Sequence, residues 1–352
     1  MLAFLWSAGA APARAQPTAA DVISAVVEVH AVIPGDARTA ASLGTQRSGA
    51  GVVIDDDGLV LTIGYLILEA ATVTVGVADT LTPAVVVAYD HATGFGLVRA
   101  RGPLQRSPLE LGDSSGLRPG DPALVIAGSE SQPVAPVRVV DRRDFAGYWE
   151  YLLENAIFTA PPQSGFAGAA LVDLHGRLVG VGSLMLQDAA NGESPLPGNM
   201  FVPIDALKPI LPDLLTRGRG PGPSRPWLGL FTRSVSGHLF VTAVAPAGPA
   251  ERAGVRPGDI VLQVAGERIS GMADFFRRVW ALGNAGTRVP LRLLRDAEIR
   301  EITIESGDRY RWLRLRPGAT ASARAAPARR DLPGAPSRPP SAAGGPHRGA
   351  AS

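Results

Sequence analysis

The sequence predicts a mostly β protein, and three observations favour this fold class. Short runs rich in Val, Ile, Leu and Thr recur through the first part of the chain, separated by turn signals such as Asp55-Asp56-Asp57-Gly58. This regular spacing is typical of an all-β barrel. A stretch rich in Gly and Pro, residues 217–224, has the composition of a linker and precedes a separate unit at 225–308. A chain of 352 residues is also long enough for two or three domains.

The two ends of the chain differ in composition from the middle. Residues 1–15 contain an apolar run that ends in Ala13-Arg14-Ala15, the A-x-A pattern of a signal-peptide cleavage site. This predicts export to the periplasm, and the alternative is a disordered Ala-rich N-terminus. Residues 309–352 are rich in Ala, Pro, Gly, Ser and Arg, which predicts a disordered tail. Its arginines are expected to be solvated, with contact to an anionic envelope surface as the alternative.

Composition excludes several classes of function. Residues 311–352 carry eight Arg and one Asp, which leaves a net charge of −5 on residues 1–310, so we expect no nucleic-acid partner. The chain has no Cys, and its five His stand at no metal-ligand spacing, so neither a metal nor a cofactor is predicted. No later run reaches the ~18 apolar residues that a transmembrane segment needs.

The first set of apolar runs predicts strands at 20–33, 49–54, 59–63, 71–77 and 83–89. Residues 49–70, GAGVVIDDDGLVLTIGYLILEA, resemble a segment of the HtrA-type (DegP-like) serine proteases. In that family a strand, an Asp-Gly turn and a second strand deliver the catalytic histidine. The corresponding position here is Tyr65. A phenol titrates near 10, so it cannot take a proton from serine at neutral pH as an imidazole does.

The next landmark of the resemblance is residues 86–99, VVAYDHATGFGLVR. Asp90 matches an acidic residue of the turn, and the position of the triad aspartate holds Gly94. A glycine can neither orient nor charge-stabilise an imidazole. His91 is the one nearby candidate for a replacement base, although a single His in a polar turn is expected to be a solvated surface residue.

The nucleophile position lies in residues 158–184, FTAPPQSGFAGAALVDLHGRLVGVGSL. Here the resemblance is to the run G-N-S-G-G-P-L-V, in which the glycine lets two backbone N–H groups point at one oxyanion. Gly165 matches that glycine, and the serine position holds Ala167. Ser164 is the alternative nucleophile, but it precedes the turn that would aim it.

A second series of strands is predicted at 124–127, at 134–141 and in the two apolar runs after Ala167. Residues 111–115 and 118–121 resemble the segment by which HtrA chains enter their second barrel, and 199–205 resembles its closing strand. A short or irregular helix is predicted from about 205 to 217, with Asp205 as its N-cap.

Residues 225–230 and 241–270 resemble a bacterial PDZ domain. The resemblance implies that an x-L-G-x turn presents backbone N–H groups to a peptide's C-terminal carboxylate, and that the next strand accepts the peptide as an added strand. It also implies a groove-lining helix at about 272–282, whose apolar residues are divided between groove and core. The predicted peptide-binding residues are Trp227, Leu228, Gly229, Leu230, Phe276, Val279 and Trp280.

The resemblance spans roughly residues 20–308. It implies a two-barrel, trypsin-like domain at 18–216 followed by an α+β PDZ domain. With Tyr65, Gly94 and Ala167 at the triad positions, the predicted function is that of an inactive HtrA-like protein. It would bind C-terminal or unfolded peptides in envelope protein quality control.

The alternatives are an active serine endopeptidase that uses Ser164 with His91, and a structural subunit of a mixed assembly with an active relative. The family also implies trimers.

Overall fold

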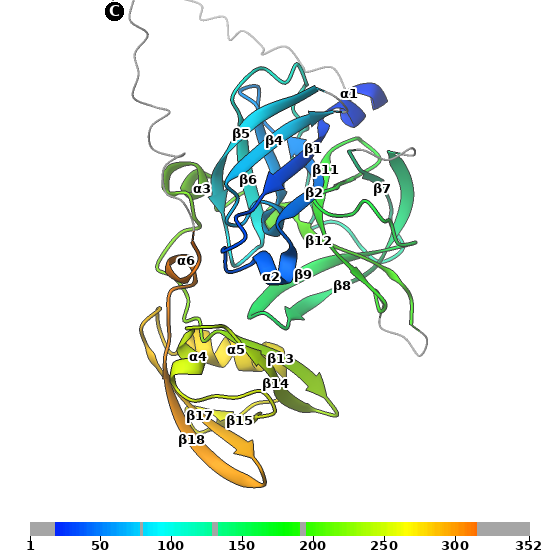
Figure 1. Cartoon of the computed structure of the whole chain (residues 1–352). Helices are drawn as coiled ribbons and strands as arrows, with labels where there is room; N and C mark the ends of the chain where they lie inside the picture. Colours follow the sequence, from blue (N-terminus) through cyan, green and yellow to red (C-terminus); the bar gives the residue numbers. More distant parts are fainter. Residues whose placement is uncertain (1–17, 78–79, 129–132, 191–194, 315–352) are drawn as a thin grey trace, which may run out of the picture.

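Residues 18–77, 80–128, 133–190 and 195–314 are described by the computed structural model. They form two closed barrels of six strands each and a C-terminal domain with a six-stranded sheet. The first barrel (blue to cyan) lies beside the second (green), and the C-terminal domain (yellow to orange) lies at one end of the pair (Figure 1). The prediction of a mostly β protein is confirmed. The predicted signal peptide, 1–15, lies outside the described residues.

The first barrel closes in the order β1-β2-β3-β6-β5-β4. Its strands are β1 (Val26–Val32), β2 (Gln46–Val53), β3 (Leu59–Ile63), β4 (Thr72–Val77), β5 (Thr80–Tyr89) and β6 (Phe95–Ala100). The acidic turn between β2 and β3 is closed by Asp55, whose carboxylate accepts a hydrogen bond from the N–H of Leu59 at 2.7 Å. Gly58 follows with a φ of 74°, a conformation that glycine adopts without a steric penalty.

The chain enters this barrel through a helix, so the strand predicted at 20–33 is wrong in its first part. The helix α1 (Ala19–Ser24) begins with a capping box. The Thr18 hydroxyl accepts the N–H of Asp21 at 3.2 Å, and the Asp21 carboxylate accepts the N–H of Thr18 at 3.0 Å. These reciprocal bonds satisfy two N–H groups that a helix start leaves unpaired. Two further short elements follow, α2 (Ala40–Leu43) and the 3-10 helix η1 (Gly64–Leu66).

The second barrel closes in the order β10-β11-β12-β9-β8-β7. Its strands are β7 (Pro122–Ile126), β8 (Val134–Gly147), β9 (Tyr151–Ala160), β10 (Ala170–Val172), β11 (Leu178–Leu186) and β12 (Gly198–Pro203). β8 and β9 have 14 and 10 residues, and their hairpin contacts the helix α5 (Met272–Ala281) of the C-terminal domain.

The segment after the second barrel differs from the helix predicted at 205–217. It forms the 3-10 helix η2 (Ile204–Ala206) and then α3 (Leu211–Arg217), whose N-cap is Ile210. Asp205 does not cap α3, because its carboxylate is held by the loop before β7. It accepts the N–H groups of Ser114 and Ser115, each at 2.8 Å. The predicted cap is therefore wrong, and its carboxylate instead ties two loops of the second barrel together.

The C-terminal domain has the sheet order β13-β14-β15-β17-β18, with β16 paired to β15. Its elements are β13 (Leu230–Val235), β14 (His238–Val244), α4 (Pro249–Arg252), β15 (Ile260–Val264), β16 (Glu267–Arg268), α5 (Met272–Ala281), β17 (Arg288–Arg295), β18 (Glu298–Glu305) and α6 (Arg309–Trp312). The helix expected at 272–282 is confirmed as α5. α6 shows that regular structure extends past 308, so the tail does not begin at 309 as predicted. Residues 315–352 lie outside the described part of the chain.

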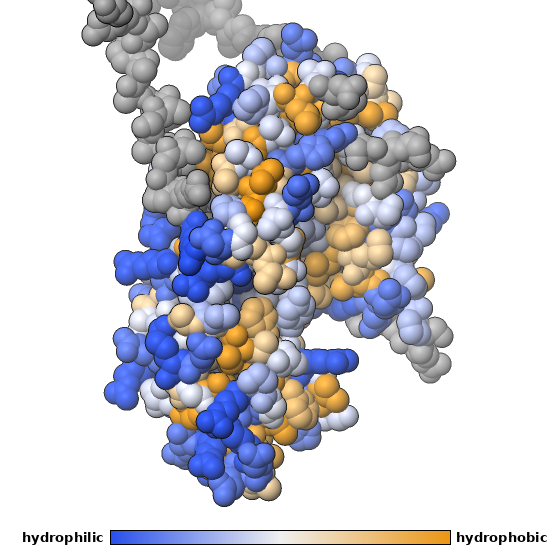
Figure 2. Space-filling model, viewed as in Figure 1, coloured by the Kyte–Doolittle hydropathy of each residue, from blue (hydrophilic) through white to orange (hydrophobic). Residues whose placement is uncertain are grey.

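The buried apolar residues form two clusters. One unites the interiors of both barrels, and the other fills the C-terminal domain and includes Leu152 of β9. Hydrophilic and apolar residues are interspersed over the face of the molecule shown in Figure 2. None of the helices in the described residues is long and apolar enough to cross a membrane.

Candidate functional site

The turn between β9 and β10 lies at the junction of the two barrels. The carbonyl of Ala167 accepts the N–H of Ala50, in β2 of the first barrel, at 2.7 Å. The N–H of Gly168 donates to the carbonyl of Gly182, in β11 of the second barrel, at 2.9 Å. The nucleophile position predicted from sequence therefore carries a methyl group on a turn that both barrels hold. Ser164 lies earlier in the turn and is exposed.

Tyr65 lies on η1, directly after β3, and its side chain reaches across the same junction. The phenol hydroxyl donates to the carbonyl of Ser183 in β11 at 2.9 Å. Burial raises the pKa of the Tyr65 phenol further above its ordinary value. The group is therefore a neutral donor that joins the two barrels, and it has no basicity with which to activate a hydroxyl nucleophile.

Gly94 lies next to η1, because its carbonyl accepts the N–H of Gly64 at 2.7 Å. It has a φ of 84°, and a Cβ atom there would lie 3.3 Å from the Tyr151 hydroxyl. That hydroxyl donates to the carbonyl of Thr93 at 2.7 Å. Tyr151, which the sequence analysis did not single out, thus occupies the space into which a side chain at 94 would grow.

These contacts bring the three predicted triad positions to one region. Positions 65 and 94 are connected through the bond between Gly64 and Gly94. Ala167 approaches from the second barrel, where its Cβ and the Leu66 side chain flank the same glycine, Gly49. At these positions the structure has a phenol, a glycine backbone and a methyl group, and none of the three is an imidazole or a carboxylate.

His91 is not the solvated surface residue that the sequence analysis expected. Its ring lies between those of Tyr89 and Tyr310, with centroids 4.4 Å and 4.2 Å away. Both ring nitrogens are buried and lack a hydrogen-bond partner among the described residues. Burial, assisted by the nearby Arg309 charge, holds the pKa of His91 well below its ordinary value, so the ring is neutral. The error arose because Tyr310 lies more than 200 positions away in the sequence.

The second region is the turn that leads into β13, where three backbone N–H groups converge on one carboxylate. The N–H groups of Leu228, Gly229 and Leu230 donate to the Glu150 carboxylate at 2.9, 2.6 and 2.8 Å. Gly229 has a φ of 79°, which allows the turn to aim consecutive N–H groups at one point. Glu150 comes from the tip of the β8–β9 hairpin and is 7% exposed. The turn is therefore a built carboxylate site.

The remaining residues predicted to bind peptide divide between core and surface. Phe276 and Val279 are each 1% exposed and belong to the buried cluster of the C-terminal domain. Trp280 is partly exposed and stacks on Phe276, with ring centroids 5.7 Å apart. Trp227 packs against Trp312, with centroids 4.7 Å apart, and the edge of its ring lies 3.3 Å from a Cβ atom built on Gly229.

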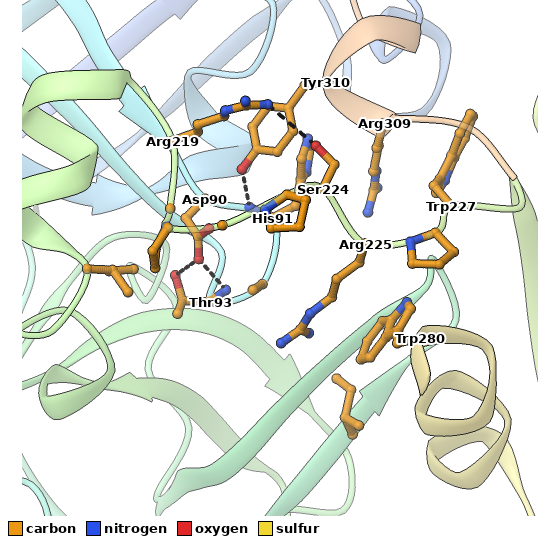
Figure 3. Close-up of a pocket in the computed structure, with 18 of the residues that line it drawn as sticks. Asp90, His91, Thr93, Arg219, Ser224, Arg225, Trp227, Trp280, Arg309 and Tyr310 are labelled. Carbon is orange, nitrogen blue, oxygen red and sulfur yellow. Dashed lines mark hydrogen bonds between the residues drawn. The ribbon is translucent and has the colours of Figure 1, made fainter. Parts of the chain in front are cut away.

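A cleft of about 530 Å³ separates the barrels from the C-terminal domain beside this site (Figure 3). The turn at 90–93 forms one wall, and the segment 219–227 forms another together with Trp280 and Arg309. Arg225 lies over the Trp280 ring, 4.5 Å from its centroid. Glu150 is also part of the cleft wall, so the carboxylate site and the cleft adjoin.

Comparison with known proteins assigns the barrels and the C-terminal domain to two known domain families. Residues 49–181 match the trypsin-like peptidase domain family, and residues 240–295 match the PDZ domain family. The chain is 31% identical over 285 residues to the serine protease PepD of Mycobacterium tuberculosis, a match that covers 73% of this chain and 61% of PepD. It is 26% identical over 269 residues to the periplasmic pH-dependent serine endoprotease DegQ of Escherichia coli, covering 73% and 58%. The chain is an HtrA-like protein.

The fold of this HtrA-like protein is also that of a solved relative. The structure of the HtrA-type protease AlgW with a decapeptide superposes with a TM-score of 0.51 and 21% identity, covering 86% of this chain and all of AlgW's. The HtrA-like chain spans about three fifths of the length of the curated relatives that it matches.

Sequence reasoning missed Glu150 because nothing near it in the chain indicates its role. The turn that it contacts is 78 to 80 positions away in the HtrA-like chain. One local feature is unusual, since this single carboxylate lies between Trp149 and Tyr151 in an otherwise apolar run. An acidic residue that is buried in such a run must find donors, because an unpaired buried carboxylate is costly.

Proposed function

We propose that this HtrA-like protein lacks serine-protease chemistry and acts by binding peptides with free C-termini through its PDZ domain. The observation that carries the proposal is the convergence of three N–H groups on a carboxylate at Leu228, Gly229 and Leu230. A peptide's C-terminal carboxylate presents the same two oxygens to such a turn. The relatives DegQ and DegP are named as periplasmic. We therefore place this function in the periplasm, in the quality control of envelope proteins.

The loss of catalysis is proposed from the contacts at the barrel junction. A serine nucleophile needs a base, and the base needs an orienting group. Tyr65 is a neutral phenol bonded to Ser183, and Gly94 has no side chain. At 167 there is no hydroxyl to activate. Removal of a single triad residue already lowers the rate by ~10⁴–10⁶, so the proposed state is a pseudoprotease.

We expect the purified protein neither to hydrolyse unfolded casein nor to label with a serine-directed phosphonate. The Ala167→Ser variant should likewise show neither hydrolysis nor labelling, because the new hydroxyl would still lack a base. Labelling is measured by intact-protein mass, with an active HtrA-type protease as the positive control. Stoichiometric labelling that disappears in Ser164→Ala would contradict this proposal and favour a displaced nucleophile. Casein hydrolysis that co-purifies with another polypeptide would instead favour the mixed assembly.

The full-length protein should bind peptides with a free apolar C-terminus at least tenfold more tightly than their C-terminal amides. The amide loses the charge-assisted bonds to the three N–H groups, and tenfold corresponds to about 1.4 kcal/mol. Fluorescence anisotropy with a free-acid peptide library and its amidated counterpart measures the ratio. Equal binding of acids and amides, or no binding below millimolar concentration, would show that the groove has no peptide function.

A further inference from the structure

We propose that the tip of the β8–β9 hairpin, residues 148–152, is an internal ligand of the PDZ groove, and that a peptide binds by displacing it. The inference rests on the peptide-binding function proposed above. It concerns what occupies the groove in the absence of peptide and what binding does to the second barrel. Three separate contacts support it: a carboxylate, a strand bond and an apolar side chain, which are the three things a bound peptide offers to such a groove.

The carboxylate contact is made by Glu150. Its two oxygens accept hydrogen bonds from the N–H groups of Leu228, Gly229 and Leu230. The donors of the site are therefore already bonded to a carboxylate of the same chain. Burial raises the pKa of the Glu150 carboxyl, while the three N–H donors and Arg309 oppose this rise. A peptide carboxylate cannot share these donors, because a second carboxylate at the same place would meet the first at contact distance.

The strand contact is made by the residue two positions before Glu150. The carbonyl of Tyr148 accepts the N–H of Thr232, in β13, at 2.9 Å. β13 is the edge strand of the sheet, so its outer N–H groups are available to an added strand. The hairpin tip therefore contacts the same edge that a peptide would use. The Tyr148 ring lies 6.3 Å from that of Phe231, which follows the carboxylate turn.

The side-chain contact is made by Leu152. This residue belongs to β9 of the second barrel, yet it is 6% exposed within the buried cluster of the PDZ domain. The same cluster contains Leu228 of the turn and Phe276 and Val279 of α5. Displacement of the hairpin would uncover this part of the cluster, which an apolar C-terminal side chain could then cover.

Two further bonds attach the hairpin to the C-terminal part of the chain. Arg277 of α5 forms an ion pair with Asp144 of β8. The Arg309 guanidinium donates to the carbonyl of Trp149 at 3.2 Å. The hairpin is part of the same chain, so it competes as a tethered ligand at a high effective concentration. If the closed form outnumbers the open form by about ten to one, the apparent affinity for a peptide falls about elevenfold.

The test compares Glu150→Ala with Glu154→Ala, both in full-length protein. Glu154 carries the same charge four residues later, is exposed, and accepts none of the hydrogen bonds that the turn donates among the described residues. The probe is a fluorescent peptide ending in Ala-Gly-Tyr-Trp-Leu with a free carboxylate, which continues the hairpin sequence 146–149 with an apolar terminus. We expect Glu150→Ala to bind it at least tenfold more tightly than the wild type, and Glu154→Ala to match the wild type.

Amide hydrogen exchange provides a readout that needs no peptide. The N–H groups of Leu228, Gly229 and Leu230 should exchange at least tenfold faster in Glu150→Ala than in the wild type or Glu154→Ala. Unchanged exchange would overturn the inference. So would equal peptide affinity of all three proteins, with the preference for acids over amides retained, and that result would leave the proposed function standing. Loss of the acid preference in every variant would overturn the proposed function itself.

Discussion

Replacement of Gly168 with alanine should destabilise the barrels by about 3–5 kcal/mol. A Cβ atom on Gly168 would lie 1.9 Å from the carbonyl oxygen of Ala50 and 2.6 Å from the hydroxyl of Thr62. That carbonyl already accepts the Thr62 hydroxyl at 2.6 Å, within the buried junction of the barrels. Relief of the clash therefore requires movement of β2 or of the turn at 167–168.

Gly222→Ala is the matched control for this substitution. Gly222 has a φ of 77°, close to the 75° of Gly168, but no atom lies within 4 Å of a Cβ built there. Both substitutions carry the same backbone strain, of about 1 kcal/mol, and only Gly168→Ala adds the clash. Urea unfolding of both variants measures the difference. A free energy of unfolding for Gly168→Ala within 1 kcal/mol of the control would show that the two barrels do not depend on this close approach.

The parts of the fold that the sequence predicts are those with a local cause. The acidic turn before Gly58 places a charged acceptor four residues before the N–H that it binds, and the pattern is visible in the sequence. The helix at 19–24 also has a local cause, the capping pair Thr18 and Asp21. The apolar residues of this segment instead led to the prediction of a strand. Propensity for strand was overridden here by capping.

The contacts that the sequence does not predict join residues far apart in the chain. Glu150 meets Gly229 across 79 positions, and Tyr310 meets His91 across 219. No periodicity or spacing reports such pairs, because their cause is the docking of one domain on another. The candidate site was therefore predictable as a set of landmark positions. The groups that fill the site could not be predicted from the sequence. They are the phenol bonded to Ser183, the ring of Tyr151 beside position 94 and the carboxylate in the PDZ turn.

The segment around α6 should contribute most of what holds the PDZ domain against the first barrel. The Tyr310 hydroxyl donates to the carbonyl of Tyr89 at 3.1 Å and accepts the N–H of His91 at 3.2 Å. The N–H of Arg314 donates to the Glu69 carboxylate at 2.8 Å. On the PDZ side, the Trp312 indole donates to the carbonyl of Pro246 at 3.2 Å. The segment therefore touches both domains.

Truncation after Gly307 should lower the thermal midpoint of the barrels by roughly 10 °C. The change uncovers the apolar surface beneath Tyr310, Trp312 and Leu313. In the full chain the Leu313 side chain is only 5% exposed. Full burial of such a side chain is worth about 1.5–3 kcal/mol, but Tyr310 and Trp312 are only partly buried, so the three together are worth roughly 3–5 kcal/mol. Each kcal/mol shifts the midpoint of a domain of this size by about 2–4 °C, which gives a shift of this order. Truncation also removes Arg309, whose bond to Trp149 holds the hairpin tip, so amide exchange at Leu228 to Leu230 should accelerate as well.

Truncation after Arg316 is the control, because it keeps the whole of α6. The composition of residues 317–352 offers little apolar surface to bury, so this variant should melt within error of the full chain. Scanning calorimetry of the three proteins measures the midpoints, and it reports the barrel and PDZ domains separately when they unfold at different temperatures. If the truncation after Gly307 melts with the full chain, α6 rests on the barrel without stabilising it. If the truncation after Arg316 falls by several degrees, the stabilising contact lies farther along the chain than α6.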